Sequence, residues 1–333
     1  MHKKRPSCLK KELACCFFVN CYSHHFISKK YCEPLHKSIF NRLRNFLIYL
    51  YFTSKNVIFQ FTINDFIPEG EYMDRSLKAA CISEFIGTGL IIFFGVGCVA
   101  AAQLAGATFG LWEISIMWGV GVALAVYTTA GVSGAHLNPA VTLALWKFAC
   151  FDGKKVVPYI ISQFLGAFCA AALVYFLYKD LFAAAEAAQN IVRGETVGFA
   201  GVFSTYPNAH ISVAQAFCVE VVITMALMAL ILALTDDGNG VPKGAMAPLL
   251  IGLLIAAIGG AFGPLTGFAM NPARDFGPKM FAFLAGWGDI AFTGARDIPY
   301  FLVPIFGPIV GALLGAWGYR RFIAKNLPCN CEK

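Results

Sequence analysis

Long apolar runs constrain this chain more than any other feature of its sequence. Several of them reach the length of about 20 residues that a helix needs to cross the hydrocarbon core of a bilayer, with one ionisable residue or none. Of the 333 residues, 58% are hydrophobic and 14% are charged, whereas roughly a quarter are charged in soluble domains. No soluble core needs so many helices that are apolar on every side, so the sequence predicts an all-α integral membrane protein.

Six membrane spans are predicted, over residues 80–104, 112–130, 157–178, 212–234, 246–264 and 299–321. Lysines and arginines beside the spans indicate the orientation, because they favour the cytoplasmic face. If the first span starts inside, ten of them lie near the inner face and five near the outer face, so both termini are expected in the cytoplasm. The inner residues are Arg75, Lys78, Lys147, Lys154, Lys155, Lys243, Arg320, Arg321, Lys325 and Lys333, and the outer ones are Lys179, Arg193, Arg274, Lys279 and Arg296.

The first 72 residues differ from the rest of the chain. They carry 11 Lys or Arg and 5 Asp or Glu, which accounts for +6 of the net charge of +7. They have no helical periodicity, no signal-peptide order and no basic aromatic stripe, so no nucleic-acid partner is expected. Met73 opens a short amphipathic lead into the first span. We therefore expect Met73 to be the natural start, with residues 1–72 a mis-assigned extension or a disordered tail.

An internal repeat divides the remainder into residues 73–206 and residues 207–333, the second part including a short cytoplasmic tail. Residues 133–140 read Ser-Gly-Ala-His-Leu-Asn-Pro-Ala, and residues 266–273 read Thr-Gly-Phe-Ala-Met-Asn-Pro-Ala. Each repeat holds three predicted spans. An odd number of crossings reverses the direction of the chain, so the second repeat must be inverted relative to the first, and the two motifs approach the midplane from opposite faces.

Each Asn-Pro-Ala motif is expected to begin a helix, because Asn is a preferred N-cap and Pro suits the first helical position. The apolar run that follows Pro139 supplies about 10 residues and so spans about 15 Å, half a bilayer. A half-helix of this kind is tolerated at membrane depth only inside protein or beside a water-filled cavity. One such motif alone would be an ordinary helix cap, but the matched pair predicts a pore. Its residues are Asn138, Pro139, Ala140, Asn271, Pro272 and Ala273.

With these motifs, residues 73–331 resemble the major intrinsic protein family, and within it the bacterial glycerol facilitators of the aquaglyceroporin branch. The resemblance implies six tilted transmembrane helices with two re-entrant half-helices, assembled as a homotetramer with one pore per subunit in the bacterial inner membrane. It further implies a channel for glycerol, related small neutral solutes and some water, which excludes ions and protons and uses no cofactor. Small-residue spacing at Gly307, Gly311 and Gly315 permits close helix contact.

The resemblance also assigns a selectivity constriction. It implies that Arg274 supplies hydrogen-bond donors and that Trp118 and Phe268 form the apolar wall, a combination that suits the two faces of a polyol. On residue type alone, Arg274 could be an interfacial arginine and Trp118 a packing residue. The backbone carbonyls expected to accept hydroxyl protons belong to residues 134–136 and 267–269, among them Gly134, Ala135, His136, Gly267 and Ala269.

At the midplane, the side-chain amides of Asn138 and Asn271 are expected to donate to a passing oxygen. Each half-helix N-terminus carries roughly half a positive charge, so cations, including hydronium, are expected to be repelled there. Water held by both donors would turn its hydrogens outward and interrupt a proton relay.

Two intramembrane acids occupy equivalent places in the repeats: Glu84 precedes the first motif's Asn by 54 residues, and Glu220 precedes the second by 51. We expect them to be buried acceptors that hold the loops leading into the motifs. The alternative, a proton relay, would need a chain of such groups. Pro278 is expected to interrupt the second half-helix.

Three other functions fit the sequence less well. A water-selective channel of the same family would be expected to have a histidine where this chain has Phe268. An intramembrane hydrolase would need a nucleophile or metal motif, and none is found. A proton-coupled transporter would need alternating access. The twelve cysteines give no four-ligand zinc spacing, so they are expected to be structural or incidental.

Overall fold

The computed structural model describes residues 72–239 and 244–327, with side chains from residue 76 onward. The chain separates into two units, the second of which is Ser76–Lys333. Residues 1–71 lie outside the described part, so the expectation that they form a disordered or mis-assigned extension is not addressed by it.

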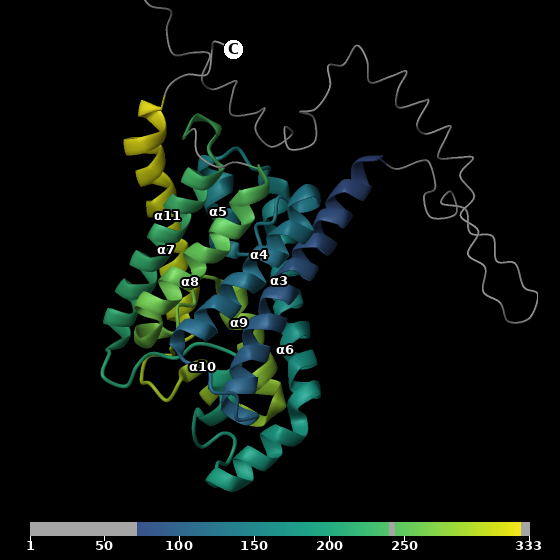
Figure 1. Cartoon of the computed structure of the whole chain (residues 1–333), viewed down its shortest axis with the longest axis vertical. Helices are drawn as coiled ribbons and strands as arrows, with labels where there is room; N and C mark the ends of the chain where they lie inside the picture. Colours follow the sequence, from purple (N-terminus) through teal and green to yellow (C-terminus); the bar gives the residue numbers. More distant parts are fainter. Residues whose placement is uncertain (1–71, 240–243, 328–333) are drawn as a thin grey trace, which may run out of the picture. The chain divides into compact units, whose positions relative to one another are not determined.

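Six helices of the described residues are long and apolar enough to cross a membrane, and each corresponds to one predicted span. They are α3 (Tyr72–Leu104), α4 (Leu111–Ser133), α6 (Gly153–Gln189), α7 (Val213–Thr235), α8 (Ala247–Thr266) and α11 (Leu302–Gly318), which a π-helical turn, η8 (Tyr319–Ile323), prolongs. Figure 1 labels all six; among them, α4 packs against α8, and α7 packs against both α8 and α11. The prediction of six spans is confirmed.

Two short helices complete the set, α5 (Pro139–Phe148) and α9 (Pro272–Ala282), and both begin at the proline of an Asn-Pro-Ala motif. Both pack against α6 and α11, and they also contact each other. Each half-helix is therefore held by a span of its own repeat and by a span of the other repeat.

The two repeats meet where α4 crosses α8. A Cβ atom added at Gly119 would collide with the backbone carbonyl oxygen of Gly252, and one added at Gly252 would collide with that of Gly119. These glycines are 133 positions apart, as are Asn138 and Asn271. The reciprocal contact is what an internal two-fold relation between the repeats produces, and only glycine allows the backbones to approach so closely.

The contact between α7 and α11 rests on the predicted small-residue ladder. Cβ atoms added at Gly307, Gly311 and Gly315 would each lie under 3.0 Å from atoms of α7. The prediction that this spacing permits close helix contact is confirmed.

Two predicted element boundaries were wrong. The third span was expected over residues 157–178, but α6 extends to Gln189, because the alanine-rich segment after residue 182 favours helix and Asn190 ends it in the left-handed conformation at a φ of 53°. Pro278 does not interrupt the second half-helix, which continues to Ala282. A Cβ added at the neighbouring Gly277 would lie 2.7 Å from that of Ala167 in α6, so tight packing holds this segment helical despite the lost backbone hydrogen bond.

Candidate functional site

The two Asn-Pro-Ala motifs are joined by a reciprocal pair of hydrogen bonds. Asn138 Nδ2 donates to the carbonyl oxygen of Met270 at 2.8 Å, and Asn271 Nδ2 donates to that of Leu137 at 2.7 Å. Each asparagine thus binds the residue that precedes the other one. The second N–H of each amide is left available, because an amide nitrogen carries two donors.

The other end of each asparagine amide caps a half-helix, as predicted. Asn138 Oδ1 accepts from the Ala140 N–H at 2.8 Å, and Asn271 Oδ1 accepts from the N–H groups of Ala273 at 3.0 Å and Arg274 at 3.2 Å. The proline of each motif occupies the first helical turn. The helix starts therefore face one another, and their positive ends converge at the paired motifs.

The loops that lead into the motifs have the same unusual backbone in both repeats. Ala135 and Leu137 have φ values of 50° and 52°, and the equivalent Phe268 and Met270 have 42° and 51°. Such left-handed conformations cost about 1–3 kcal/mol each for residues with a Cβ, so other contacts must hold them. The carbonyl oxygens of the expected acceptors Gly134, Ala135, His136, Gly267 and Ala269 accept no hydrogen bond from another described residue.

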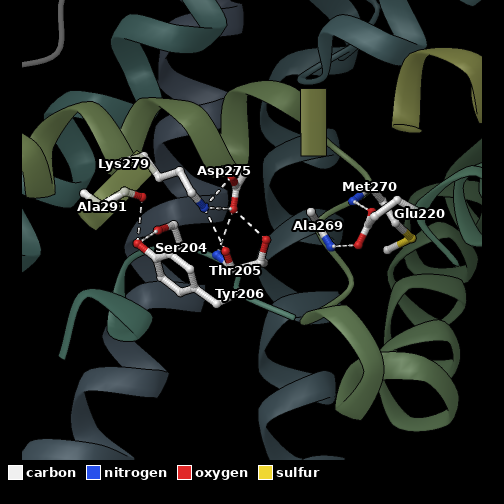
Figure 2. A network of polar contacts seen from close by, with 9 residues as sticks. All are labelled: Ser204, Thr205, Tyr206, Glu220, Ala269, Met270, Asp275, Lys279 and Ala291. Atoms are coloured by element: carbon white, nitrogen blue, oxygen red, sulfur yellow. Dashed lines mark hydrogen bonds and ion pairs between the residues drawn. The ribbon is translucent and has the colours of Figure 1, made fainter. Parts of the chain in front are cut away.

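A buried carboxylate supports each loop. Glu220, which is 0% exposed, accepts from the N–H groups of Ala269 at 3.0 Å and Met270 at 2.8 Å, and from the Thr266 hydroxyl at 2.7 Å. Figure 2 shows its carboxylate turned toward the two N–H groups. The two N–H groups lie between the Cα atoms of the left-handed residues Phe268 and Met270, so these bonds fix the backbone there.

Glu84 makes the equivalent contacts in the first repeat. It accepts from the N–H groups of His136 at 2.9 Å and Leu137 at 2.7 Å, and from the Ser133 hydroxyl at 2.6 Å. The side-chain amide of Gln163 donates to the same carboxylate at 2.7 Å and to the Thr142 hydroxyl at 3.0 Å. Each acid is thus surrounded by donors rather than by a chain of further acids.

The ring of His136 is held in one orientation by its neighbours. Its Nδ1 lies 3.2 Å from the Thr142 hydroxyl, and its ring packs on Phe151 and Tyr159 with centroids 4.4 and 5.1 Å away. In the second repeat, the equivalent position is Ala269. The two loops therefore share a backbone but differ in the side chain at this point.

Trp118, Phe268 and Arg274 come together although they lie on α4, the second loop and α9. The guanidinium carbon of Arg274 is 3.9 Å from the centroid of the Trp118 ring, and the rings of Trp118 and Phe268 meet edge to face at 6.4 Å. The guanidinium thus lies over the indole face rather than across a gap from it. Arg274 Nη1 is buried and has no hydrogen-bond partner among the described residues. An apolar wall and an unpaired donor are therefore adjacent.

Two glycines behind Phe268 were not predicted as part of this site. A Cβ added at Gly259 would lie 2.9 Å from Phe268 Cζ, and one added at Gly263 would lie 3.1 Å from Phe268 Cδ1. Both belong to α8, and they leave the space that the ring occupies. The sequence offered no signal beyond the abundance of glycine in this helix.

A fully buried ion pair lies beside the site (Figure 2). Lys279 Nζ lies 2.9 and 2.7 Å from the two carboxylate oxygens of Asp275, one helical turn away, and both side chains are 0% exposed. Both also bind Thr205: its carbonyl oxygen accepts from Lys279 at 2.8 Å, and its N–H and hydroxyl donate to Asp275 at 2.7 and 2.6 Å. A Cβ added at Gly267 would lie 3.0 Å from Thr205 Cβ. The ion pair therefore holds the segment at Thr205 against the loop that carries Phe268.

The segment between α6 and α7 has a second anchor at Arg193. Its guanidinium pairs with Glu186 at 2.7 Å, donates to the Ala285 carbonyl oxygen at 2.7 Å, and lies 4.2 Å from the ring centroid of Trp287. Burial lowers the pKa of Arg193, but hydrogen bonds to Glu186 and Tyr175 raise it, and the net direction is upward. The charge of Arg193 is thus a permanent part of this anchor.

The described residues contain no group of His, Cys, Asp or Glu that could hold a metal ion. Their geometry combines the cluster of Trp118, Phe268 and Arg274, a pair of facing helix starts and free carbonyl oxygens. Such groups bind and orient a polar solute, and none of them is a nucleophile placed beside a base.

Comparison with known proteins gives a consistent result. The chain is 72% identical to the glycerol uptake facilitator protein of Haemophilus influenzae over 261 residues, which cover 78% of this chain and 99% of that protein. It is 71% identical to the glycerol uptake facilitator protein of Escherichia coli over 257 residues, 77% of this chain and 92% of the relative. The aquaglyceroporin structure from Plasmodium falciparum matches with a TM-score of 0.66 and 32% identity, over 75% of this chain and 98% of that one.

Residues 71–319 match the family described as Major intrinsic protein. The match includes both Asn-Pro-Ala motifs, all six spans and both half-helices. With its six spans, the chain is an integral multi-pass membrane protein, and it belongs to the major intrinsic protein family.

Proposed function

We propose that this chain is a channel for the passive diffusion of glycerol and related small neutral solutes across the membrane, with ions and protons excluded. The observation that carries the proposal is the buried, unpaired Nη1 of Arg274 beside the rings of Trp118 and Phe268. Glycerol has hydroxyls on one side of an apolar carbon chain, so it matches both parts of this constriction. The names of the two bacterial relatives, glycerol uptake facilitator protein, support the choice of solute.

In the proposed mechanism, the carbon chain of glycerol lies against the two rings while its hydroxyls bind the guanidinium of Arg274. Its hydroxyls then donate hydrogen bonds, one after another, to the free carbonyl oxygens of the two loops, including those of Gly134, Ala135, His136, Gly267 and Ala269. Each lost bond to water is replaced by a bond to protein, which lowers the cost of dehydrating the solute. No covalent step is involved, so the protein is a channel and not an enzyme.

At the paired motifs, the second N–H groups of Asn138 and Asn271 donate to the passing oxygen. The positive ends of α5 and α9 converge at the same place, which disfavours cations. A water molecule that accepts from both amides directs its own hydrogens away, and this breaks the line of waters along which a proton would move.

Glu84 and Glu220 serve as loop-supporting residues in this proposal. Their hydrogen bonds keep the loops in the left-handed conformation that leaves the carbonyl oxygens free. A relay role would require further acids near each carboxylate, whereas the described surroundings are donors.

The assembly and the location belong to the same proposal. We infer a homotetramer in a bacterial inner membrane, with both termini cytoplasmic and with residues 73–206 and 207–333 as the two channel repeats. The excess of Lys and Arg near one face supports the orientation.

The test is a stopped-flow measurement of glycerol and water permeability in vesicles that contain the purified chain. A channel is expected to raise glycerol permeability far above that of empty vesicles, without saturation or counterflow. Water entry with no glycerol entry would favour a water-selective channel. Saturable exchange would favour a transporter.

A further inference from the structure

The indole ring of Trp118 rests flat on a glycine of the first span. A Cβ atom added at Gly95 in α3 would lie under 3.0 Å from Trp118 and equally far from its Cδ2, Cε3 and Cζ3 atoms. A point equidistant from three atoms of a six-membered ring lies on the axis through the ring centre. The missing methyl group would therefore stand directly over the ring, and the backbone at Gly95 covers this face.

The opposite face of the same ring is covered by Arg274. Its guanidinium carbon lies 3.9 Å from the ring centroid, and the backbone at Gly95 leaves it no room on the first face. Trp118 is only 3% exposed. The indole ring is therefore held between the backbone of α3 and the guanidinium. It cannot move away from Arg274 without clashing with the backbone of α3.

We propose that Gly95 is a specificity-determining residue of this channel, because the absence of its side chain gives the Trp118 ring the room in which it stacks on Arg274. The inference rests on the proposed function and extends it to a residue that touches no solute. Any side chain at this position must push the ring toward the guanidinium, since a fixed helix backbone lies behind it. Because the ring already contacts the guanidinium, the two groups are displaced together into the constriction, and the wider solute is affected first.

The helix itself supplies a matched control. Gly97 lies two residues further along α3, and a Cβ atom added there meets no atom within 4 Å. Gly95→Ala and Gly97→Ala therefore make the same chemical change and give the same gain in helix propensity. They differ in whether the new methyl group meets the Trp118 ring.

The experiment compares water, urea and glycerol permeability of the full chain and these two variants in vesicles, scaled to the amount of inserted protein. For Gly95→Ala, we expect glycerol permeability to fall by about tenfold relative to water, the factor expected when a typical overpacking cost acts on the wider solute alone. Urea is expected to fall less than glycerol. Gly97→Ala should keep the ratios of the wild-type chain.

A second pair of variants separates narrowing from misfolding. In Trp118→Ala the ring is absent, so adding Gly95→Ala should leave the glycerol-to-water ratio of that variant unchanged. If Gly95→Ala does not insert but the double variant does, the clash with the ring is established by another route. The inference is overturned if Gly95→Ala keeps the wild-type ratios, or if the double variant is impaired as severely as Gly95→Ala alone. A wild-type chain without glycerol permeability would instead refute the proposed function.

Discussion

The carboxylate of Asp275 and the ammonium of Lys279 lie 2.7 Å apart, and neither has any exposed surface. The first repeat has Thr142 and Trp146 at the equivalent positions. The inverted halves thus share a backbone but stabilise their half-helices with different chemistry, an ion pair on one side and neutral hydrogen bonds on the other.

Removing one member of this ion pair should be more damaging than removing both charges. Lys279→Met leaves a buried carboxylate without its cation, which typically costs about 3–5 kcal/mol, whereas the double variant Asp275→Asn/Lys279→Met leaves no buried charge. We expect a lower unfolding temperature in detergent for the single variant and a partial recovery in the double one. Lys325→Met, a change at an exposed lysine, serves as the control. Equal losses in the single and double variants would contradict this account.

The loop-supporting acids should be intolerant of amidation. In Glu220→Gln or Glu84→Gln, one side-chain oxygen becomes an N–H₂ group and leaves one buried backbone N–H without an acceptor, at a cost of about 1–3 kcal/mol. Because the strained loops then relax, water and glycerol permeability should both fall in vesicles. Glu113→Gln, at an exposed position, should conduct normally. Normal conduction by both loop variants would show that the carboxylates are dispensable.

Replacing the motif asparagines by aspartate should impair conduction. Asn138→Asp removes the donor to the Met270 carbonyl oxygen and places a negative charge at the converging helix starts, and Asn271→Asp does the same at Leu137. Glycerol influx is the measurement, with Asn326→Asp near the C-terminus as the control. Unchanged flux in both motif variants would mean that the motifs act only as helix caps.

Two substitutions at the constriction should separate the effect of its shape from the effect of its charge. Phe268→His introduces a smaller, polar ring, so glycerol flux should fall while water flux is largely spared. Arg274→Val removes the donors and a positive charge, so a proton or cation leak should appear in a pH-dye or conductance assay. A Phe268→His variant with an unaltered glycerol-to-water permeability ratio would place the selectivity filter elsewhere. An Arg274→Val variant without a proton or cation leak would assign ion exclusion to the paired motifs alone.

The extension should be dispensable for conduction. The family match begins at residue 71, and both bacterial relatives align with less than four-fifths of this chain. A chain that starts at Met73 is therefore expected to insert and to conduct glycerol as well as the full chain, when scaled to the amount in the membrane. Failure of the shortened chain to insert would identify the extension as a true anchor.

Much of the fold could be predicted from the sequence, because its determinants are local. Apolar runs give the spans, and Asn138 and Asn271, each followed by proline, give the starts of the half-helices. The helix end at Gln189 was misjudged because the apolar pattern fades before the helix does. The continuation through Pro278 depends on packing against α6, which no local pattern reveals.

The contacts that shape the site could not be predicted in the same way. Thr205 lies 70 positions from Asp275, and Gly95 lies 23 positions from Trp118, so only the folded chain brings these pairs together. A glycine that makes room for a ring looks in the sequence like any other glycine in a span. The resemblance to the family identified Arg274 and its aromatic neighbours, but it did not identify what stands behind them.

The reciprocal bonds between the motifs have a consequence for biosynthesis. When the ribosome has delivered the first repeat, the amide of Asn138 and the carbonyl oxygen of Leu137 have no partners, because both partners lie in the half not yet made. Unpaired groups of this kind are costly at membrane depth. We therefore expect the first half-helix to reach its final position only after the second repeat has entered the bilayer, so that the pore is completed late in assembly.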